Sequence, residues 1–184
     1  MVEQASADRL PMPESLNPEQ RRAVERITSG LRGGLFGPFV PLLRAPELMT
    51  RVQLVGEYLR FESELPDHLR ELLILLVARD WDQDFEWGHH VPLARASGLG
   101  EDVIATIAAG GAPVGPHDVR AFWRLAAELV RGHAVGDATF ADAVAAAGEV
   151  AVVEAIVTIG YYTTLAMTMN AARTPIPDDY ERLP

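Results

Sequence analysis

The chain contains no cysteine and no lysine in 184 residues, so all sixteen of its cationic side chains are arginines. Without cysteine it can form no disulfide, thiol nucleophile or thiolate metal site, and packing alone must stabilise the fold. Without lysine, Schiff-base chemistry through a lysine amine is excluded. The absent residue types therefore leave carboxylates, imidazoles, hydroxyls and guanidinium groups as the side chains that could carry chemistry.

Positive charge is scarce as well. The formal net charge is −10 and the pI is about 4.9. Because nucleic-acid binding needs a basic stripe that neutralises phosphates, we expect no nucleic-acid partner. We also expect no membrane partner, since no uninterrupted apolar run looks long enough to span a bilayer. The N-terminus has no basic segment followed by an apolar stretch, so we expect no signal peptide and a cytoplasmic location.

The hydrophobic pattern predicts an all-α fold, because apolar residues recur at helical spacing and no segment shows the alternation of a half-buried strand. Hydrophobic residues make up 48% of the chain, enough for one domain with a substantial core. We predict an extended arm over residues 1–17, one helical domain over 18–173 and a tail over 174–184. Asn17 is the expected N-cap of the first helix, with Pro18 in its first turn. The expected helices lie at 18–29, from 46 onward, 65–81, 86–96, 101–109, 117–131, 138–147 and 150–172.

The strongest chemical signal is the set Glu71, Glu86 and His90. Glu86 and His90 are four residues apart, so on a helix they share one face. Glu71 begins an apolar run over residues 72–78, where a carboxylate is either a helix-start residue or a group held beside the core. If the two helices pack together, the three side chains could line one small polar pocket. A carboxylate in apolar surroundings beside an imidazole is suited to proton transfer next to a carbonyl, or to protonation of a leaving group.

Two other interpretations use the same residues. Glu86 and His90 could form an exposed ion pair on a solvated helix face. Alternatively, Glu86 and His89 form a Glu-x-x-His unit, as in di-iron helix bundles, although the second unit that such a site needs is absent from the sequence. We therefore predict no metal site and no cofactor.

Four further residues are candidates for substrate binding: Arg70, Trp87, His89 and Tyr162. The first three adjoin the acid/base set in sequence. For Tyr162 on the last helix, core packing is the favoured interpretation and lining the pocket is the alternative. The apolar segment 35–43 carries two prolines, and we expect it to cover a pocket or a partner surface.

The spacing of these residues resembles that of the carboxymuconolactone decarboxylase family, which includes the AhpD-like alkylhydroperoxidases. The resemblance rests on Arg70, Glu71, Glu86, Trp87, His90, Pro92, Ala94, Gly98 and Leu99. It implies an AhpD-like helical bundle that forms a homo-oligomer, as a dimer, trimer or hexamer. In the peroxidase branch a Cys-x-x-Cys pair precedes the histidine, and its positions correspond to Gln83 and Glu86 here, so thiol peroxidase chemistry is excluded.

The decarboxylase branch lacks those cysteines and acts on a lactone acid. This resemblance implies that Glu86 and His90 act as acid and base and that Glu71 sets the tautomer of the histidine or relays a proton. Arg44, Arg70 or an arginine of a neighbouring subunit could bind the acid group. We therefore expect a cofactor-independent lyase or isomerase acting on a small oxygenated metabolite. The alternatives are a ligand-binding or assembly protein with a degenerate site and, third, a metal-binding protein.

Overall fold

The computed structural model describes residues 8–184, so the first seven residues of the predicted arm lie outside it. The regular secondary structure of the described part is helical throughout and includes no strand, which confirms the all-α prediction. Its helices are α1 (Pro18–Ser29), α2 (Phe39–Leu42), α3 (Pro46–Phe61), α4 (Asp67–Asp80), α5 (Asp84–Ala96), α6 (Glu101–Ala108), α7 (His117–Gly132) and α8 (Asp137–Ala172).

Helix α1 begins where its capping residues predict. The side chain of Asn17 accepts a hydrogen bond from the backbone N–H of Gln20 (2.9 Å), and the side chain of Gln20 accepts one from the backbone N–H of Asn17 (3.0 Å). This reciprocal pair satisfies two donors that the first turn would otherwise leave free. Pro18 follows at the first helical position, where its missing N–H costs nothing.

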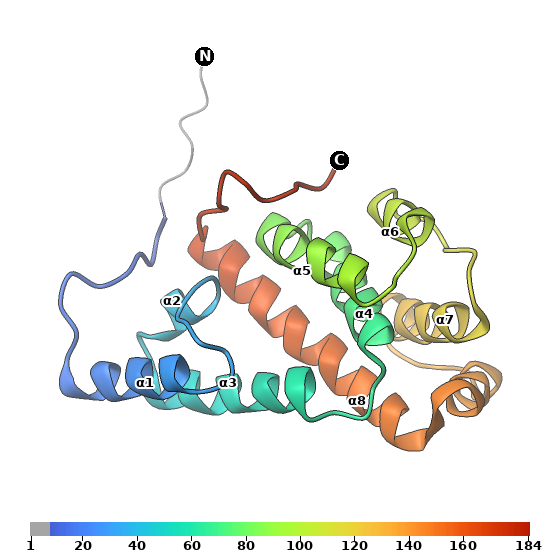
Figure 1. Cartoon of the computed structure of the whole chain (residues 1–184), viewed down its shortest axis with the longest axis horizontal. Coiled ribbons are helices and arrows are strands. Elements are labelled where there is room, and N and C mark those ends of the chain that lie inside the picture. The colour runs from blue at the N-terminus through green and yellow to red at the C-terminus, as the bar shows by residue number, and fades with distance from the viewer. Residues whose placement is uncertain (1–7) are drawn as a thin grey trace, which may run out of the picture.

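Helix α4 is the centre of the core. Every residue from Leu69 to Ala78 is buried, which is the expected position of a helix that is apolar on all sides. Helices α5, α6, α7 and α8 pack against it, and α5 follows it after a short turn. Figure 1 shows α8 running along the length of the molecule, past α3 at one end and α7 at the other. Glu71 therefore lies on the most buried helix of the fold.

Helix α8 is divided by Gly148, whose backbone angles (φ 87°, ψ 166°) are not helical. The two helices predicted at 138–147 and 150–172 correspond to its two parts. By length and composition α8 could cross a membrane, and 39% of the residues in the most apolar stretch are buried in the structure. The expectation that no segment of this chain is long enough to span a bilayer is therefore wrong for α8, although a core helix passes the same test.

Two segments outside the central helices close the fold around α5. The predicted apolar segment forms α2, and Phe39 packs with Ile27, Leu43 and Met49 in a small separate core. At the other end of the chain, the residues after α8 return to α5, where the backbone N–H of Leu183 donates to Asp84 (2.9 Å). The first segment reaches the residues around Glu86 and His90, whereas the tail lies along the side of α5 that carries Asp84 and Gly88.

Candidate functional site

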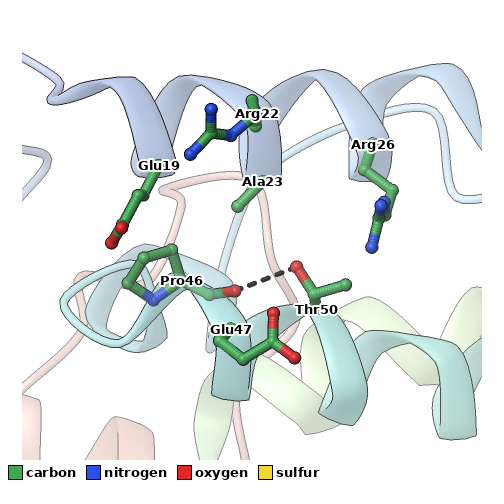
Figure 2. A pocket seen from close by; sticks show the side chains of 7 residues that line it. All are labelled: Glu19, Arg22, Ala23, Arg26, Pro46, Glu47 and Thr50. Atoms are coloured by element: carbon green, nitrogen blue, oxygen red, sulfur yellow. Dashed lines mark hydrogen bonds between the residues drawn. The ribbon is translucent and has the colours of Figure 1, made fainter.

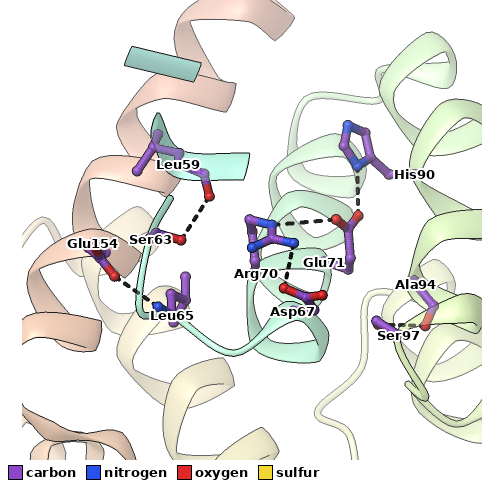
Figure 3. A network of polar contacts seen from close by, with 10 residues as sticks. All are labelled: Leu59, Ser63, Leu65, Asp67, Arg70, Glu71, His90, Ala94, Ser97 and Glu154. Atoms are coloured by element: carbon purple, nitrogen blue, oxygen red, sulfur yellow. Dashed lines mark hydrogen bonds and ion pairs between the residues drawn. The ribbon is translucent and has the colours of Figure 1, made fainter. Parts of the chain in front are cut away.

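The structure brings Glu71, Glu86 and His90 together. His90 Nδ1 lies 2.7 Å from Glu71 Oε2, and His90 Nε2 lies 3.5 Å from Glu86 Oε2. Figure 3 shows the imidazole of His90, from α5, facing the carboxylate of Glu71 on α4. Each ring nitrogen of His90 thus faces a different carboxyl group. An ionised carboxylate can only accept a hydrogen bond, so this geometry favours the tautomer with the proton on Nδ1, and Nε2 faces Glu86.

The local sequence explains why these groups meet. Glu86 and His90 are one turn apart on α5, and the turn between α4 and α5 occupies only residues 81–83. Gln83 caps α5, because its side chain accepts a hydrogen bond from the backbone N–H of Phe85 (2.8 Å). All three acid/base residues are at most 4% exposed. The interpretation of Glu86 and His90 as an exposed surface pair is thus inconsistent with their burial.

Burial changes the pKa of Glu86. Its pKa is raised because desolvation disfavours the carboxylate, although the nearby charges of His90, Arg32 and Arg60 oppose that effect. Glu71 has a different neighbour, because Arg70 Nε lies 3.7 Å from Glu71 Oε1. One carboxyl group is thus held beside a cation and an imidazole, while the other favours the protonated acid. Such a difference suits one group to hold a proton and the other to stabilise a cationic imidazole.

A narrow pocket with a volume of about 20 Å³ opens on this cluster, enough for about one water molecule. The side chains around it come from the segment before α2, from α2 itself and from α3, α5 and α8. They are Arg32, Phe36, Pro38, Phe39, Arg60, Phe85, Glu86, His89, His90, Tyr162 and Leu165. The apolar segment predicted to cover a pocket or a partner surface thus supplies three of the residues that line this pocket, Phe36, Pro38 and Phe39.

The predicted substrate-binding residues His89 and Tyr162 both line this pocket. Tyr162 stands edge-on to His90, with ring centroids 5.2 Å apart, and burial raises the pKa of its hydroxyl well above the usual value. His89 lies among Phe36, Phe85 and Tyr180. Burial, together with the charges of His90, Arg60 and Arg32, lowers its pKa to about 3. His89 is therefore neutral at physiological pH.

The other predicted binding residues lie elsewhere. Trp87 is 1% exposed and belongs to the core, not to the pocket lining. Arg70 pairs with Asp67 (2.8 Å) as well as with Glu71, as Figure 3 shows. It therefore contacts the cluster through Glu71 and does not line the pocket. Arg44, which we considered as the cation for an acid group, donates to the backbone carbonyls of Val40 and Pro11 instead.

Arg32 and Arg60 line the pocket but were not identified from the sequence. Neither belongs to a motif that reveals it. Arg32 lies in the glycine-rich stretch after α1, and Arg60 in the last turn of α3 resembles any arginine that complements a helix C-terminus. Only the folding of both segments over α5 brings these cations to the acid/base residues.

A separate hollow of about 260 Å³ lies between α1 and α3 and contains none of these groups. Figure 2 shows its lining of Glu19, Arg22, Ala23, Arg26, Pro46, Glu47 and Thr50. The charged side chains there are two carboxylates and two guanidinium groups, and all four of these residues are exposed. Residues 8–184 contain no group of three histidine, aspartate or glutamate side chains arranged to hold a metal ion.

Fold and site together define an all-α protein with a buried carboxyl–imidazole–carboxyl cluster. Residues 46–128 match the model of the carboxymuconolactone decarboxylase family, which confirms the family resemblance seen in the sequence. The matched stretch runs from the start of α3 into α7 and contains Glu71, Glu86 and His90. A search of curated proteins found no match for the chain. Arg32, Tyr162 and the tail lie outside the matched stretch and are features of this chain beyond that segment.

Proposed function

We propose that this protein is a carboxymuconolactone decarboxylase-like enzyme that transfers protons to and from a small oxygenated metabolite without a cofactor. The observation that carries the proposal is the position of His90 between two carboxyl groups, with Nδ1 bound to Glu71 and Nε2 directed to Glu86. A fold does not need a buried titratable cluster of this kind, and its burial beside a pocket is typical of acid/base sites.

In this proposal His90 Nε2 accepts the proton from a carbon next to a carbonyl group, and the Glu71 carboxylate stabilises the imidazolium that forms. The protonated Glu86 then gives its proton to another carbon of the same substrate, and His90 returns a proton to Glu86, so the net reaction is an isomerisation. In a decarboxylation, the bond to the carboxyl carbon breaks, carbon dioxide leaves, and Glu86 protonates the carbon that retains the electron pair. The same residues serve both reactions.

A protein without turnover, which keeps a degenerate site for ligand binding or assembly, is the second candidate. The observation that favours the loss of turnover is the small size of the pocket, because about 20 Å³ is far below the several hundred cubic ångströms of most small-molecule sites. Catalysis requires the segment around Phe36 and Pro38 to move when a substrate enters, whereas a protein that holds its site closed would bind weakly and convert nothing.

Proton exchange in D₂O separates these two functions. We expect the protein to exchange protons next to the carbonyl group in at least one member of a panel of small keto acids and unsaturated lactones, followed by NMR. His90→Ala and Glu86→Gln should each slow this exchange by about 10²- to 10⁴-fold, the usual contribution of a positioned acid or base. Glu64→Gln, an exposed carboxylate on the loop before α4, is the matched control and should have no effect. Exchange that survives both site substitutions would contradict the enzymatic proposal.

A further inference from the structure

Arg32 is the least satisfied cation in the described part of the chain. Its Nε and Nη2 atoms are buried and have no hydrogen-bond partner among residues 8–184. A guanidinium group is always charged and carries five N–H donors. Burying two donor nitrogens without an acceptor costs free energy, and a bound acceptor would remove that cost. Arg32 nevertheless keeps this position, which lies in the wall of the pocket that contains Glu86 and His90.

The surrounding side chains hold this guanidinium group in place. Arg32 Cζ lies 4.5 Å from the centroid of the Phe39 ring, a cation–π contact. Its Nη2 atom packs against Gly56 of α3, where an added Cβ would lie 2.7 Å from Nη2 and 2.0 Å from the hydroxyl oxygen of Tyr161. That hydroxyl is also buried without a partner in the described residues. Burial raises its pKa to about 12, although the charge of Arg32 and a side-chain contact with Arg32 oppose that effect, so the hydroxyl stays protonated beside the guanidinium group.

A second cation faces the same pocket. Arg60, from the last turn of α3, lines it together with Arg32 and Glu86. Among the described residues that line the pocket, Glu86 is the one with a carboxyl group. Two guanidinium groups therefore outnumber it, and burial raises the pKa of Glu86, which weakens its negative charge further. The pocket therefore carries an excess of positive charge, beside an apolar wall that includes Phe36, Phe39 and Phe85.

We propose that Arg32 and Arg60 form an anion subsite, and that the ligand of this pocket is a small organic carboxylate with an apolar or aromatic body. This inference rests on the proposed function, since it names the substrate class of the same site. A carboxylate is an acceptor with two oxygens in one plane, the group that the arginine fork binds in a bidentate manner. Its apolar part would lie against Phe36, Phe39 and Leu165, with the adjacent carbon directed to His90.

Ligand entry has a structural requirement. The pocket admits about one water molecule as it stands, so a carboxylate of this class must displace the segment that carries Phe36 and Pro38. That segment lies between α1 and the four-residue helix α2, and Arg32 is at its start. Pairing of Arg32 with the ligand and rearrangement of the wall are therefore expected to occur together.

Isothermal titration with benzoate and benzamide tests the subsite, because the two compounds share a ring and differ in charge. The full-length protein should bind benzoate at least about 10-fold more tightly than benzamide, the difference expected for a charge-assisted hydrogen-bond pair. Arg32→Gln should remove about 10-fold of the benzoate affinity and leave benzamide unchanged. Arg22→Gln, in the hollow between α1 and α3 that Figure 2 shows, is the matched control and should bind both compounds like the wild type.

Two further variants keep the test valid if Arg32→Gln fails to fold, as judged by circular dichroism. Arg60→Gln should lower benzoate affinity selectively, and Arg32→Lys should retain the charge but lose part of the affinity because it has no planar fork. The inference is overturned if benzoate fails to bind the wild type, if benzamide binds as tightly, or if the arginine variants bind benzoate like the wild type. Selective benzoate binding in a protein whose proton exchange does not depend on His90 would sustain the anion subsite while contradicting the proposed enzyme.

Discussion

His90 makes contacts of two kinds with its carboxyl partners. The 2.7 Å contact with Glu71 is a short hydrogen bond between buried groups, whereas the 3.5 Å distance to Glu86 lies at the limit of hydrogen bonding. The first contact fixes the orientation of the ring, and the second leaves room for a proton or a substrate atom to intervene. Orientation and reactivity are thus assigned to different sides of one imidazole.

Glu71→Gln should therefore affect stability as well as activity. The substitution keeps the size of the side chain but removes the charge that faces His90 and Arg70, so we expect the free energy of unfolding to fall by about 1–3 kcal/mol. Urea denaturation measures this change. Glu64→Gln, at an exposed position, should remain within about 0.5 kcal/mol of the wild type. Equal stabilities of the two variants would show that the Glu71–His90 contact contributes nothing to folding.

His89 makes a contribution to stability that depends on pH. Its pKa is about 3 in the folded protein, against 6.5 for the free side chain, so the unfolded chain binds more protons between these values. Stability supplied by the neutral ring is therefore complete above pH 6.5 and is lost as the pH falls towards 3. His89→Phe should reduce the loss between pH 6 and pH 4 by up to about 1.4 kcal/mol per pH unit. His133→Asn, at an exposed helix end, should leave the pH profile of urea denaturation unchanged.

Helix α5 is shaped by contacts on both of its sides. One side packs on α4, and the other lies beneath the returning tail, where Gly88 faces Tyr180 and the carbonyl of Glu181. The tail is tied down further by the pairing of Glu181 with Arg95 (2.9 Å) and by a contact of the Tyr180 hydroxyl with His89 Nδ1 (3.1 Å). Gly88 is needed here because the backbone of α5 and the tail approach closely.

Gly88→Ala should loosen the tail even though alanine favours helices. The new Cβ would lie 2.5 Å from Tyr180 Cβ, so the tail must shift. A loss of about 1 kcal/mol in tail docking raises the undocked population about fivefold, and trypsin should cleave after Arg173 faster by a similar factor. Mass spectrometry follows the appearance of peptides that begin at Thr174. Gly160→Ala, in α8 with open space around it, is the control and should not accelerate cleavage. Unchanged cleavage in Gly88→Ala would show that the tail tolerates the extra methyl group.

At the level of elements, the sequence predicted most of the architecture for identifiable reasons. Asn17, Pro18 and Pro46 mark helix starts through capping and the fixed φ of proline, and the structure has helices beginning there. The motif around Glu71 and His90 predicted the family, which the match over residues 46–128 confirms. Arg32 and Arg60 were missed because their role arises from tertiary packing, which leaves no local pattern. The docked position of the tail was missed for the same reason.

The whole molecule has an apolar face that its own helices do not cover. Leu54, Val55 and Tyr58 of α3 are exposed, and so are Val150, Val153 and Val157 of α8. Several of these residues surround a groove of about 460 Å³ between the two helices, with Glu149 at its border. Carboxylates repel the anionic headgroups of a membrane surface, whereas a polar border around an apolar centre is typical of protein interfaces. We therefore propose that a second copy of this chain covers the face.

Val153→Arg should disrupt that association, because Val153 is 59% exposed in the single chain and would be buried in an assembly. Sedimentation of the wild type should give a mass that is a multiple of 20.1 kDa, and the variant should shift towards the single-chain mass. Val114→Arg, at a position that is 82% exposed and lies outside this face, should sediment like the wild type. A wild type that sediments as a single chain at micromolar concentration would contradict the proposed assembly.

The tail that crosses Gly88 and the stretch that carries Arg32 come from opposite ends of the chain, and both reach the helix that bears Glu86 and His90. The reactive groups and Arg60 thus belong to the matched segment, while Arg32 and the apolar wall of the pocket belong largely to its two flanks. Exchanging either flank for that of another protein would redirect the choice of molecule and leave the proton-handling groups as they are. Excising residues 46–128 alone would, by the same division, keep Arg60 beside the cluster but remove Arg32 and the segment that closes the pocket.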